Sequence, residues 1–171
     1  MENVPFKETV KQRLIESSKK YYSLINKRIM MISDCFTNKK EYCIRFYETN
    51  FLHLTGVKTS FSAKDFFDLC YEETITLNDF DCDSSNSLKG QIRRKLHNLM
   101  NIDTFFTQIL EVQEGFEKGT NKCLLAASDD RCTIGFADAK YYVRPKTILD
   151  KNHLDKNKPI IKVKPVIINC K

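Results

Sequence analysis

The sequence predicts an α+β fold, with an N-terminal helix and β-hairpin, short central helices and a C-terminal antiparallel sheet. Two observations indicate this class. Apolar residues recur at helical spacing mainly before residue 101, whereas residues 105–169 consist of several candidate strands divided by turn signals. Separation of helices from strands along the chain is typical of α+β proteins. The 171 residues suffice for one core, and 5 Gly and 4 Pro leave no evident linker, so we treat 1–171 as a single domain.

The N-terminal part predicts one helix and two strands. Residues 6–28 are expected to form a long amphipathic helix, because Pro5 suits a helix start and apolar side chains follow at helical spacing. Those side chains are Val10, Leu14, Tyr21 and Ile25. Residues 29–36 and 41–48 are expected to pair as a hairpin, since a polar turn separates two apolar stretches.

The central part predicts two further helices. Ser62 is followed by Asp65 in a pattern like a capping box, which marks the start of a short helix. Residues 73–86 are polar and acidic, as in a loop, with a turn of helix near 77–80. Ser87 is expected to cap a helix over 88–101, whose core stripe is Leu88, Ile92, Leu96, Leu99 and Met100.

The last third predicts the strands of the sheet. Turn signals at 115–121 and 128–131 separate candidate strands over 105–113, 122–128, 131–137, 140–144 and 160–169. Because Pro165 lacks a backbone N–H, the final strand is expected at an edge, after a loop over 151–159.

The charge distribution favours a polyanionic partner such as RNA on one face. The net charge is +6, with basic residues concentrated before residue 40 and after residue 151. Residues 65–84 instead carry seven acidic residues and no basic one, so this region is a candidate contact for a basic protein partner. The alternative is a solvated surface of uneven charge.

Several common classes of protein are disfavoured. The N-terminus lacks the apolar region of a signal peptide, and no apolar run is long enough to span a membrane, so we expect a cytoplasmic protein with reduced cysteines. The seven cysteines include no C-x-x-C pair, which argues against structural zinc. Glycine-rich phosphate loops, H-E-x-x-H and G-x-S-x-G are absent. We therefore expect neither a metal nor a cofactor.

The segment from Phe46 to Val57 carries the main candidate for catalysis. His53 lies within an apolar run and is followed by Thr55 and Gly56. Histidine is the side chain most easily poised for proton transfer near neutral pH. The alternatives are that His53 is a hydrogen-bonded core residue and that Gly56 ends a helix.

Two further groups of basic residues are candidates for phosphate contacts. Arg144 and Lys146 flank Pro145 in a late segment, and the alternative is an ordinary exposed strand end. Lys89, Arg93 and His97 recur every fourth residue and form a basic row on the predicted helix, for which the alternative is a solvated helix face.

These motifs resemble a known family of nucleases. A strand followed by N-F-x-H-L-x-G (Asn50–Gly56) and the late Y-x-x-P-K-[ST] segment (Tyr142–Thr147) resemble the phage and mobile-element branch of the barnase–EndoU–colicin–RelE-like nuclease superfamily. The resemblance extends from about Lys27 to Leu149 and is strongest over Tyr42–Val57.

The resemblance implies a toxin-like, metal-independent ribonuclease in which the ribose 2′-hydroxyl attacks the phosphate. It assigns proton transfer to His53 and stabilisation of phosphate charge to Arg144 and Lys146. The expected substrate-orienting residues are Thr55, Tyr142 and Thr147, and the basic row adds Lys89 and Arg93 as substrate-binding candidates. No second acid or base pairs with His53 in the sequence. The rival hypotheses are an inactive module of the same fold that binds nucleic acid or inhibits a host defence protein, and a protein-interaction domain that uses the acidic 65–84 region.

Overall fold

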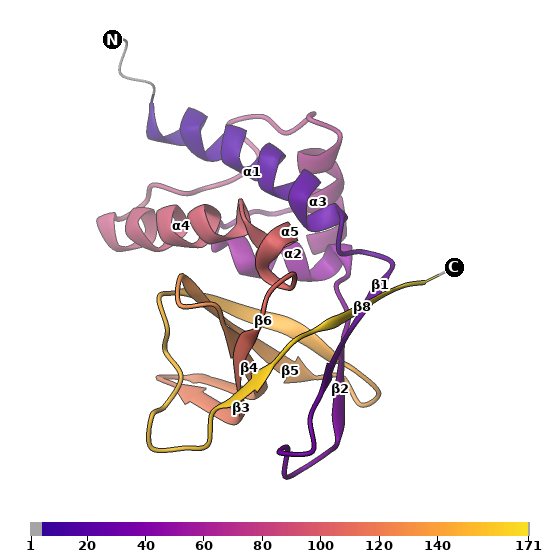
Figure 1. Ribbon diagram of the computed structural model, residues 1–171. Helices are drawn as coiled ribbons and strands as arrows, with labels where there is room; N and C mark the ends of the chain where they lie inside the picture. The colour runs from indigo at the N-terminus through magenta and orange to yellow at the C-terminus, as the bar shows by residue number, and fades with distance from the viewer. Residues whose placement is uncertain (1–4, 171) are drawn as a thin grey trace.

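The computed structural model describes residues 5–170 and has the expected α+β fold, with helices gathered on one side of a curled sheet (Figure 1). The helices of this range are α1 (Phe6–Tyr22), α2 (Glu48–Thr55), α3 (Ala63–Tyr71), α4 (Asn86–Leu99) and α5 (Ile102–Phe105). Every helix within the described residues is too short or too polar to cross a membrane.

The strands form one sheet that includes the N-terminal hairpin. They are β1 (Lys27–Ile32), β2 (Glu41–Ile44), β3 (Leu110–Lys118), β4 (Asn121–Ser128), β5 (Cys132–Asp138), β6 (Val143–Asp150), β7 (Ile161–Val163) and β8 (Val166–Asn169). Their order is β7-β3-β4-β5-β6-β2-β1-β8. All neighbours pair antiparallel except β2 and β6, which run parallel through Ile44 and Val143. The sheet is therefore mixed at the point where the hairpin joins the later strands.

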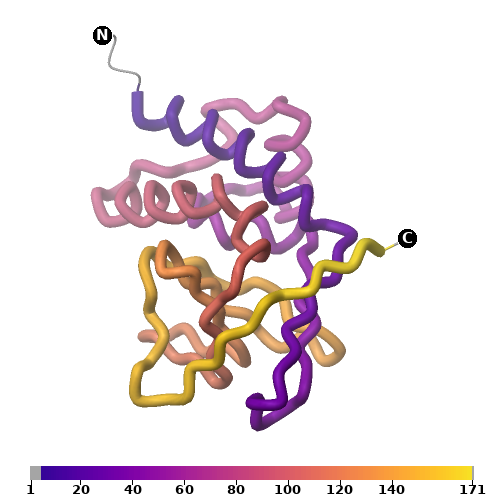
Figure 2. The backbone as a smooth tube through the Cα atoms, in the orientation of Figure 1, coloured from indigo at the N-terminus to yellow at the C-terminus, as the bar shows by residue number. Residues whose placement is uncertain are grey.

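The sheet curls because its two edges are neighbours along the chain. β7 pairs with β3 at one end of the order and β8 pairs with β1 at the other, yet only Lys164 and Pro165 separate the two strands. An extended chain covers at most about 3.3–3.6 Å per residue, so these edges lie within about 10 Å of each other. Figure 2 shows the C-terminal chain running from the loop beside β3 across to β1.

A carboxylate on β3 also joins the two ends of the sheet. Glu114 accepts hydrogen bonds from the Thr37 N–H (2.8 Å) and hydroxyl (2.9 Å), the Asn38 N–H (3.1 Å) and the Tyr42 hydroxyl (2.5 Å). Tyr42 lies on β2, four strands away from β3 in the sheet order. This contact therefore holds the β1–β2 connection against β3 across the opening of the curl.

The aromatic core joins the helices to the sheet. Tyr21 of α1 contacts the rings of Phe46, Phe51 and Phe67 at centroid distances of 5.4, 5.3 and 5.9 Å. All four side chains are buried. Aromatic contacts of this kind contribute about 0.5–1.5 kcal/mol each beyond the area that they bury. They hold α1, α2 and α3 together above the sheet.

The first helix ends earlier than the sequence predicts. Its stripe of Val10, Leu14 and Tyr21 is buried as expected, but α1 stops at Tyr22, so the prediction of helix to residue 28 was wrong. Asn26 has φ +65°, which breaks the helix. Ile29 and Met31 then enter the core as alternate residues of β1. Strand pairing with β2 and β8 outweighs the helical spacing of this stretch.

The central helices match the predictions more closely. The Ser62 hydroxyl accepts a hydrogen bond from the Asp65 N–H and caps α3. The cap of α4 is Ser85 rather than Ser87, since its hydroxyl accepts from the Leu88 N–H at 3.1 Å. Residues 77–80 form a turn and no helix, contrary to the prediction.

Three predicted strands needed correction. The stretch 105–113 begins at the last residue of the single helical turn α5, which buries Ile102 and Phe105 at a spacing of three, and β3 starts only at Leu110. The stretch 140–144 lies largely in the turn before β6, where Lys140 has φ +73°. The stretch 160–169 divides into two edge strands at Lys164–Pro165, in keeping with the poor fit of proline in a central strand.

Candidate functional site

His53 lies on an exposed face of α2. The helix begins after Tyr47, whose N–H donates to the Asn50 side-chain oxygen at 3.2 Å, and it packs Phe51 and Leu54 into the core. His53 projects away from those two residues and is exposed. The alternative of a buried core histidine is therefore wrong. Gly56 has φ +77° and ends the helix in the left-handed conformation, as the C-cap alternative proposed.

Helix α4 places Lys95 beside the end of α2. A β-carbon at Gly56 would lie 3.1 Å from Cδ and 3.7 Å from Nζ of Lys95, so the Lys95 side chain lies directly over the glycine. The absence of a side chain at position 56 thus lets the ammonium group approach the turn that carries His53. Burial lowers the pKa of Lys95.

A β-bulge in β6 displaces Lys146 from the regular ladder. Gly135 of β5 pairs with Thr147 of β6, but the next residue of β5, Phe136, pairs with Pro145. One step along β5 therefore corresponds to two steps along β6. Lys146 is therefore the additional residue, and bulges of this kind redirect side chains. Its ammonium group donates to the Lys122 carbonyl at 2.9 Å. Pro145 is tolerated here because a bulge interrupts the regular hydrogen bonds.

Gly135 makes room for the neighbouring strands. A β-carbon at this position would lie 2.6 Å from Sγ of Cys123 on β4 and 3.0 Å from Cγ2 of Thr147 on β6. Real side chains do not approach so closely, so only glycine allows Thr147 and Cys123 to close over β5. The position of Thr147 therefore depends on a glycine one strand away.

A cleft of about 410 Å³ opens between α2, α4 and the end of β6. Its lining combines the His53 side chain with a lysine, an arginine, amides, a carboxylate and a hydroxyl. The residues are His53, Gln91, Arg94, Lys95, Asn121, Thr147, Ile148, Leu149 and Asp150. The volume lies within the range of about 300–1,000 Å³ that is usual for ligand sites.

Positive charge surrounds His53. Partial burial lowers the pKa of the His53 imidazole, and the cations Lys95, Arg144 and Lys146 lower it further. The ring is thereby favoured in its neutral form, in which one nitrogen can accept a proton. Arg144 and Lys146 do not line the cleft, but they lie close enough to act on His53 through space.

The other candidate residues lie outside this cleft. Thr55 is buried, and its hydroxyl donates to the Leu52 carbonyl at 2.7 Å and accepts from the Val57 N–H at 3.2 Å. It therefore stabilises the end of α2. Tyr142 packs its ring against Tyr47, with centroids 5.6 Å apart, and lines a separate hollow beside β2.

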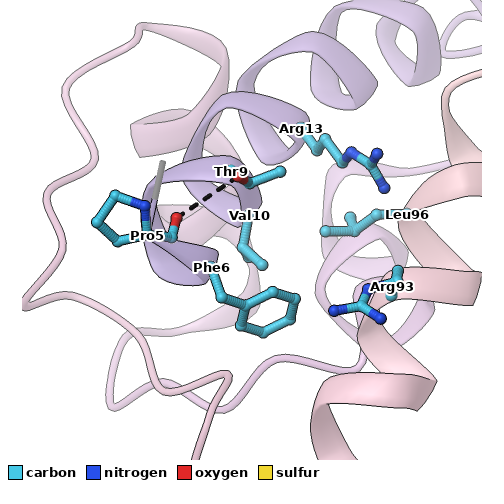
Figure 3. Close-up of a pocket in the computed structure, with 7 residues that line it drawn as sticks. All are labelled: Pro5, Phe6, Thr9, Val10, Arg13, Arg93 and Leu96. Carbon is cyan, nitrogen blue, oxygen red and sulfur yellow. Dashed lines mark hydrogen bonds between the residues drawn. The ribbon is translucent and has the colours of Figure 1, made fainter. Parts of the chain in front are cut away.

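Lys89 and Arg93 lie at a different groove. Their cationic groups stand 5.8 and 5.3 Å from the centre of the Phe6 ring. Figure 3 shows Arg93 of α4 beside Phe6 of α1. The structure thus brings His53 and Thr147 into one cleft, places Arg144 and Lys146 beside it, and separates Lys89 and Arg93 from it.

The sequence did not single out Lys95, which lines the cleft beside His53. The spacing of Gln91 and Lys95 marks a second polar row on the same helix, parallel to the row of Lys89 and Arg93. Spacing alone cannot tell which row faces β6, and the row of Lys89 and Arg93 was the more basic of the two. Among residues 5–170 no three His, Cys, Asp or Glu side chains gather as metal ligands.

The comparison with protein families gives one match that covers most of the chain. The family model described as phage-Barnase-EndoU-ColicinE5/D-RelE like nuclease4 matches residues 13–167, a span that includes α2, α4 and β6. No curated protein and no solved structure gives a significant match. The resemblance expected from the His53 and Tyr142–Thr147 segments is thereby confirmed. With most of its length matched, the chain belongs to the phage-Barnase-EndoU-ColicinE5/D-RelE like nuclease4 family.

Proposed function

We propose that this nuclease-like domain cleaves RNA without a metal ion, using the ribose 2′-hydroxyl as nucleophile. The observation that supports the proposal is the position of His53 at a polar cleft, where partial burial and then three nearby cations lower its pKa. A neutral imidazole accepts a proton, and nearby cations stabilise the phosphorane charge that develops when the 2′-oxygen attacks. The family match supports a nucleic-acid substrate.

In the proposed reaction His53 is the general base. Its neutral ring nitrogen takes the 2′-hydroxyl proton while the 2′-oxygen forms a bond to phosphorus. The bond from phosphorus to the 5′-oxygen breaks, and the products are a 2′,3′-cyclic phosphate and a 5′-hydroxyl. Arg144 and Lys146 stabilise the charged phosphorane, and Thr147 orients the substrate from the cleft wall.

The leaving 5′-oxygen requires a proton, and we assign its donor to Lys95. This ammonium group lines the same cleft as His53, and burial lowers its pKa. A lowered pKa makes a lysine a more effective proton donor near neutral pH. Lys95 thus supplies the partner that the sequence did not reveal for His53. A role in a phage or mobile element is a further proposal, which the phage association in the family's name supports.

The test compares RNA with DNA of the same sequence in the presence of EDTA. We expect cleavage of RNA alone, with 2′,3′-cyclic phosphate ends, and a loss of about 10²–10⁴-fold in rate for His53→Ala. Lys95→Met should lose rate on the same scale. Cleavage of DNA, or a full rate for His53→Ala, contradicts the mechanism. RNA binding without cleavage by the wild type favours the rival hypothesis of an inactive binding module.

A further inference from the structure

A second cleft lies between α1 and α4, on the other side of α4 from His53. It has a volume of about 410 Å³, and its floor is formed by Phe6, Val10 and Leu96. Arg13 of α1 and Arg93 of α4 border the groove from its two sides (Figure 3). Among residues 5–170, no carboxylate lines it. The groove thus combines a small apolar floor with cations from two separate helices.

The cations of this groove are available to a ligand. Within residues 5–170, neither Arg13 nor Arg93 forms a salt bridge. Arg93, which lines the groove, instead lies over the Phe6 ring at 5.3 Å from its centre, and Lys89 lies near the same ring. Arginine favours planar, bidentate contacts with phosphate oxygens. The groove therefore suits a phosphate that carries an attached flat or apolar group.

The two clefts are joined by the exposed surface of α4. Arg93 and Leu96 face the groove, whereas Gln91 and Lys95 face the His53 cleft. The exposed Arg94 lies between them on the outer surface of the helix and lines the His53 cleft. A helix with its side chains is about 10–12 Å across, so a strand of a few nucleotides can cross it. Arg94 thus provides a cation on the face of α4 between the two clefts.

We infer that the groove of Arg13, Arg93 and Phe6 binds a phosphate of the same RNA strand, a few nucleotides from the cleaved bond. The inference rests on the proposed function and adds a preference for substrates long enough to cross α4. An acidic protein partner is the competing occupant. A stable protein interface needs about 800 Å² on each side, whereas seven residues line this groove, and it lies across α4 from the His53 cleft.

The test separates contact in the groove from chemistry at His53. The probe is a single-stranded RNA of about 12 nucleotides, within the usual range of single-strand sites, with 2′-O-methyl groups that prevent cleavage. We expect Arg13→Gln/Arg93→Gln to weaken its binding about tenfold and to reduce the slope of log affinity against log salt by about 1–2. Cleavage of ribodinucleotides, which are too short to reach the groove, should be unchanged.

The control removes the same charge elsewhere. Arg28→Gln/Lys162→Gln changes two exposed cations on β1 and β7 and should leave both affinity and salt slope nearly unchanged. If both double variants bind the probe equally well, the groove does not bind the strand. If the wild type binds the probe through the groove but cleaves neither dinucleotides nor longer RNA, the contact between the groove and the strand stands and the proposed chemistry fails.

Folding of the variants is measured alongside. Arg93 packs on Phe6, so its loss can also loosen α1 against α4. Arg13→Gln alone leaves that packing in place and should still weaken binding of the long probe. An unchanged affinity for this folded single variant, with a normal melting temperature, would count against the inference.

Discussion

Lys95 lies across Gly56, with its Cδ only 3.1 Å from the point where a β-carbon at position 56 would stand. The contact joins α4 to the end of α2, two residues beyond Leu54 and three beyond His53. Gly56 therefore has two roles. Its φ of +77° ends α2, and its missing side chain sets how closely the Lys95 ammonium approaches the cleft.

Gly56→Ala should reduce both stability and activity. A left-handed conformation costs a residue with a β-carbon about 1–2 kcal/mol, which lowers the melting temperature of a protein of this size by about 2–8 °C. The new methyl group also displaces Lys95, so we expect slower RNA cleavage by molecules that remain folded. Thermal melting and a cleavage assay at a temperature well below the transition measure the two effects.

Gly119→Ala is the matched control for this variant. Gly119 also has a positive φ, +58°, but a β-carbon there would meet no atom within 4 Å. We expect a similar loss of stability and no loss of cleavage. Equal activities of the two variants would show that the position of Lys95 over Gly56 does not matter for the reaction.

The pH dependence of cleavage should report the environment of His53. Its pKa is lowered from 6.5 by partial burial and by Lys95, Arg144 and Lys146. A general base works in its deprotonated form, so the rate should rise with pH through this lowered pKa and reach its maximum before neutral pH. Rates measured from about pH 4 to 8 at constant ionic strength test the expectation.

Removal of one cation near His53 should shift the pH range in which the cleavage rate rises. Arg144→Gln takes away a positive charge that disfavours the imidazolium, so the pKa of His53 should rise and that range should shift to higher pH. NMR titration of the His53 ring follows the same change directly, with His97→Gln and His153→Gln used to assign the signals. A His53 titration that is identical in Arg144→Gln would show that the cation does not act on the ring.

Local signals in the sequence predicted several elements well. The Ser62 cap, the strands near 122–128 and 131–137 and the turn between them follow from residues that are neighbours in sequence. Turn residues bound both strands, β5 contains the strand-favouring residues Thr133, Ile134 and Phe136, and a serine side chain at a cap accepts a hydrogen bond from a nearby backbone N–H. Such features need no information about the rest of the fold.

Elements decided by distant contacts were harder to predict. The stretch 23–28 carries Leu24 and Ile25 at helical spacing, yet the chain turns at Asn26 because β1 pairs with both β2 and β8. The run of Phe105 and Phe106 is typical of a strand, but both rings pack into the core from around the one-turn helix α5. Parallel pairing of β2 with β6 likewise depends on residues a hundred positions apart.

In the candidate site, too, local motifs could be predicted from the sequence, whereas contacts between distant residues could not. His53 and the Tyr142–Thr147 segment were found from short motifs, but which side chains meet His53 depends on how α4 lies against β6. Sequence spacing gave equal reason to choose the row of Lys89 and Arg93 or the row of Gln91 and Lys95. Only the packing of α4 shows that Lys95 faces the cleft and that Arg93 faces α1.

Glu114→Gln should destabilise the fold without touching the cleft. Burial tends to raise the pKa of Glu114, but hydrogen bonds from Tyr42, Thr37 and Asn38 outweigh it and lower that pKa below 4.5. An amide has one acceptor oxygen and cannot keep all four hydrogen bonds, so we expect a loss of about 1–3 kcal/mol in the free energy of unfolding at pH 7.

The loss caused by Glu114→Gln should itself depend on pH. Because the folded-state pKa is depressed, the carboxylate stabilises the fold above its unfolded pKa of about 4.3, and this contribution disappears as the pH falls through the folded value. Urea unfolding at pH 7 and at about pH 3 should therefore show a smaller difference in unfolding free energy between wild type and variant at the lower pH.

Glu117→Gln is the control, since Glu117 is exposed on the same strand and its side chain forms no hydrogen bond within residues 5–170. A variant as stable as the wild type at pH 7, or a difference that is the same at both pH values, would mean that the Glu114 carboxylate does not hold β3 against the β1–β2 connection.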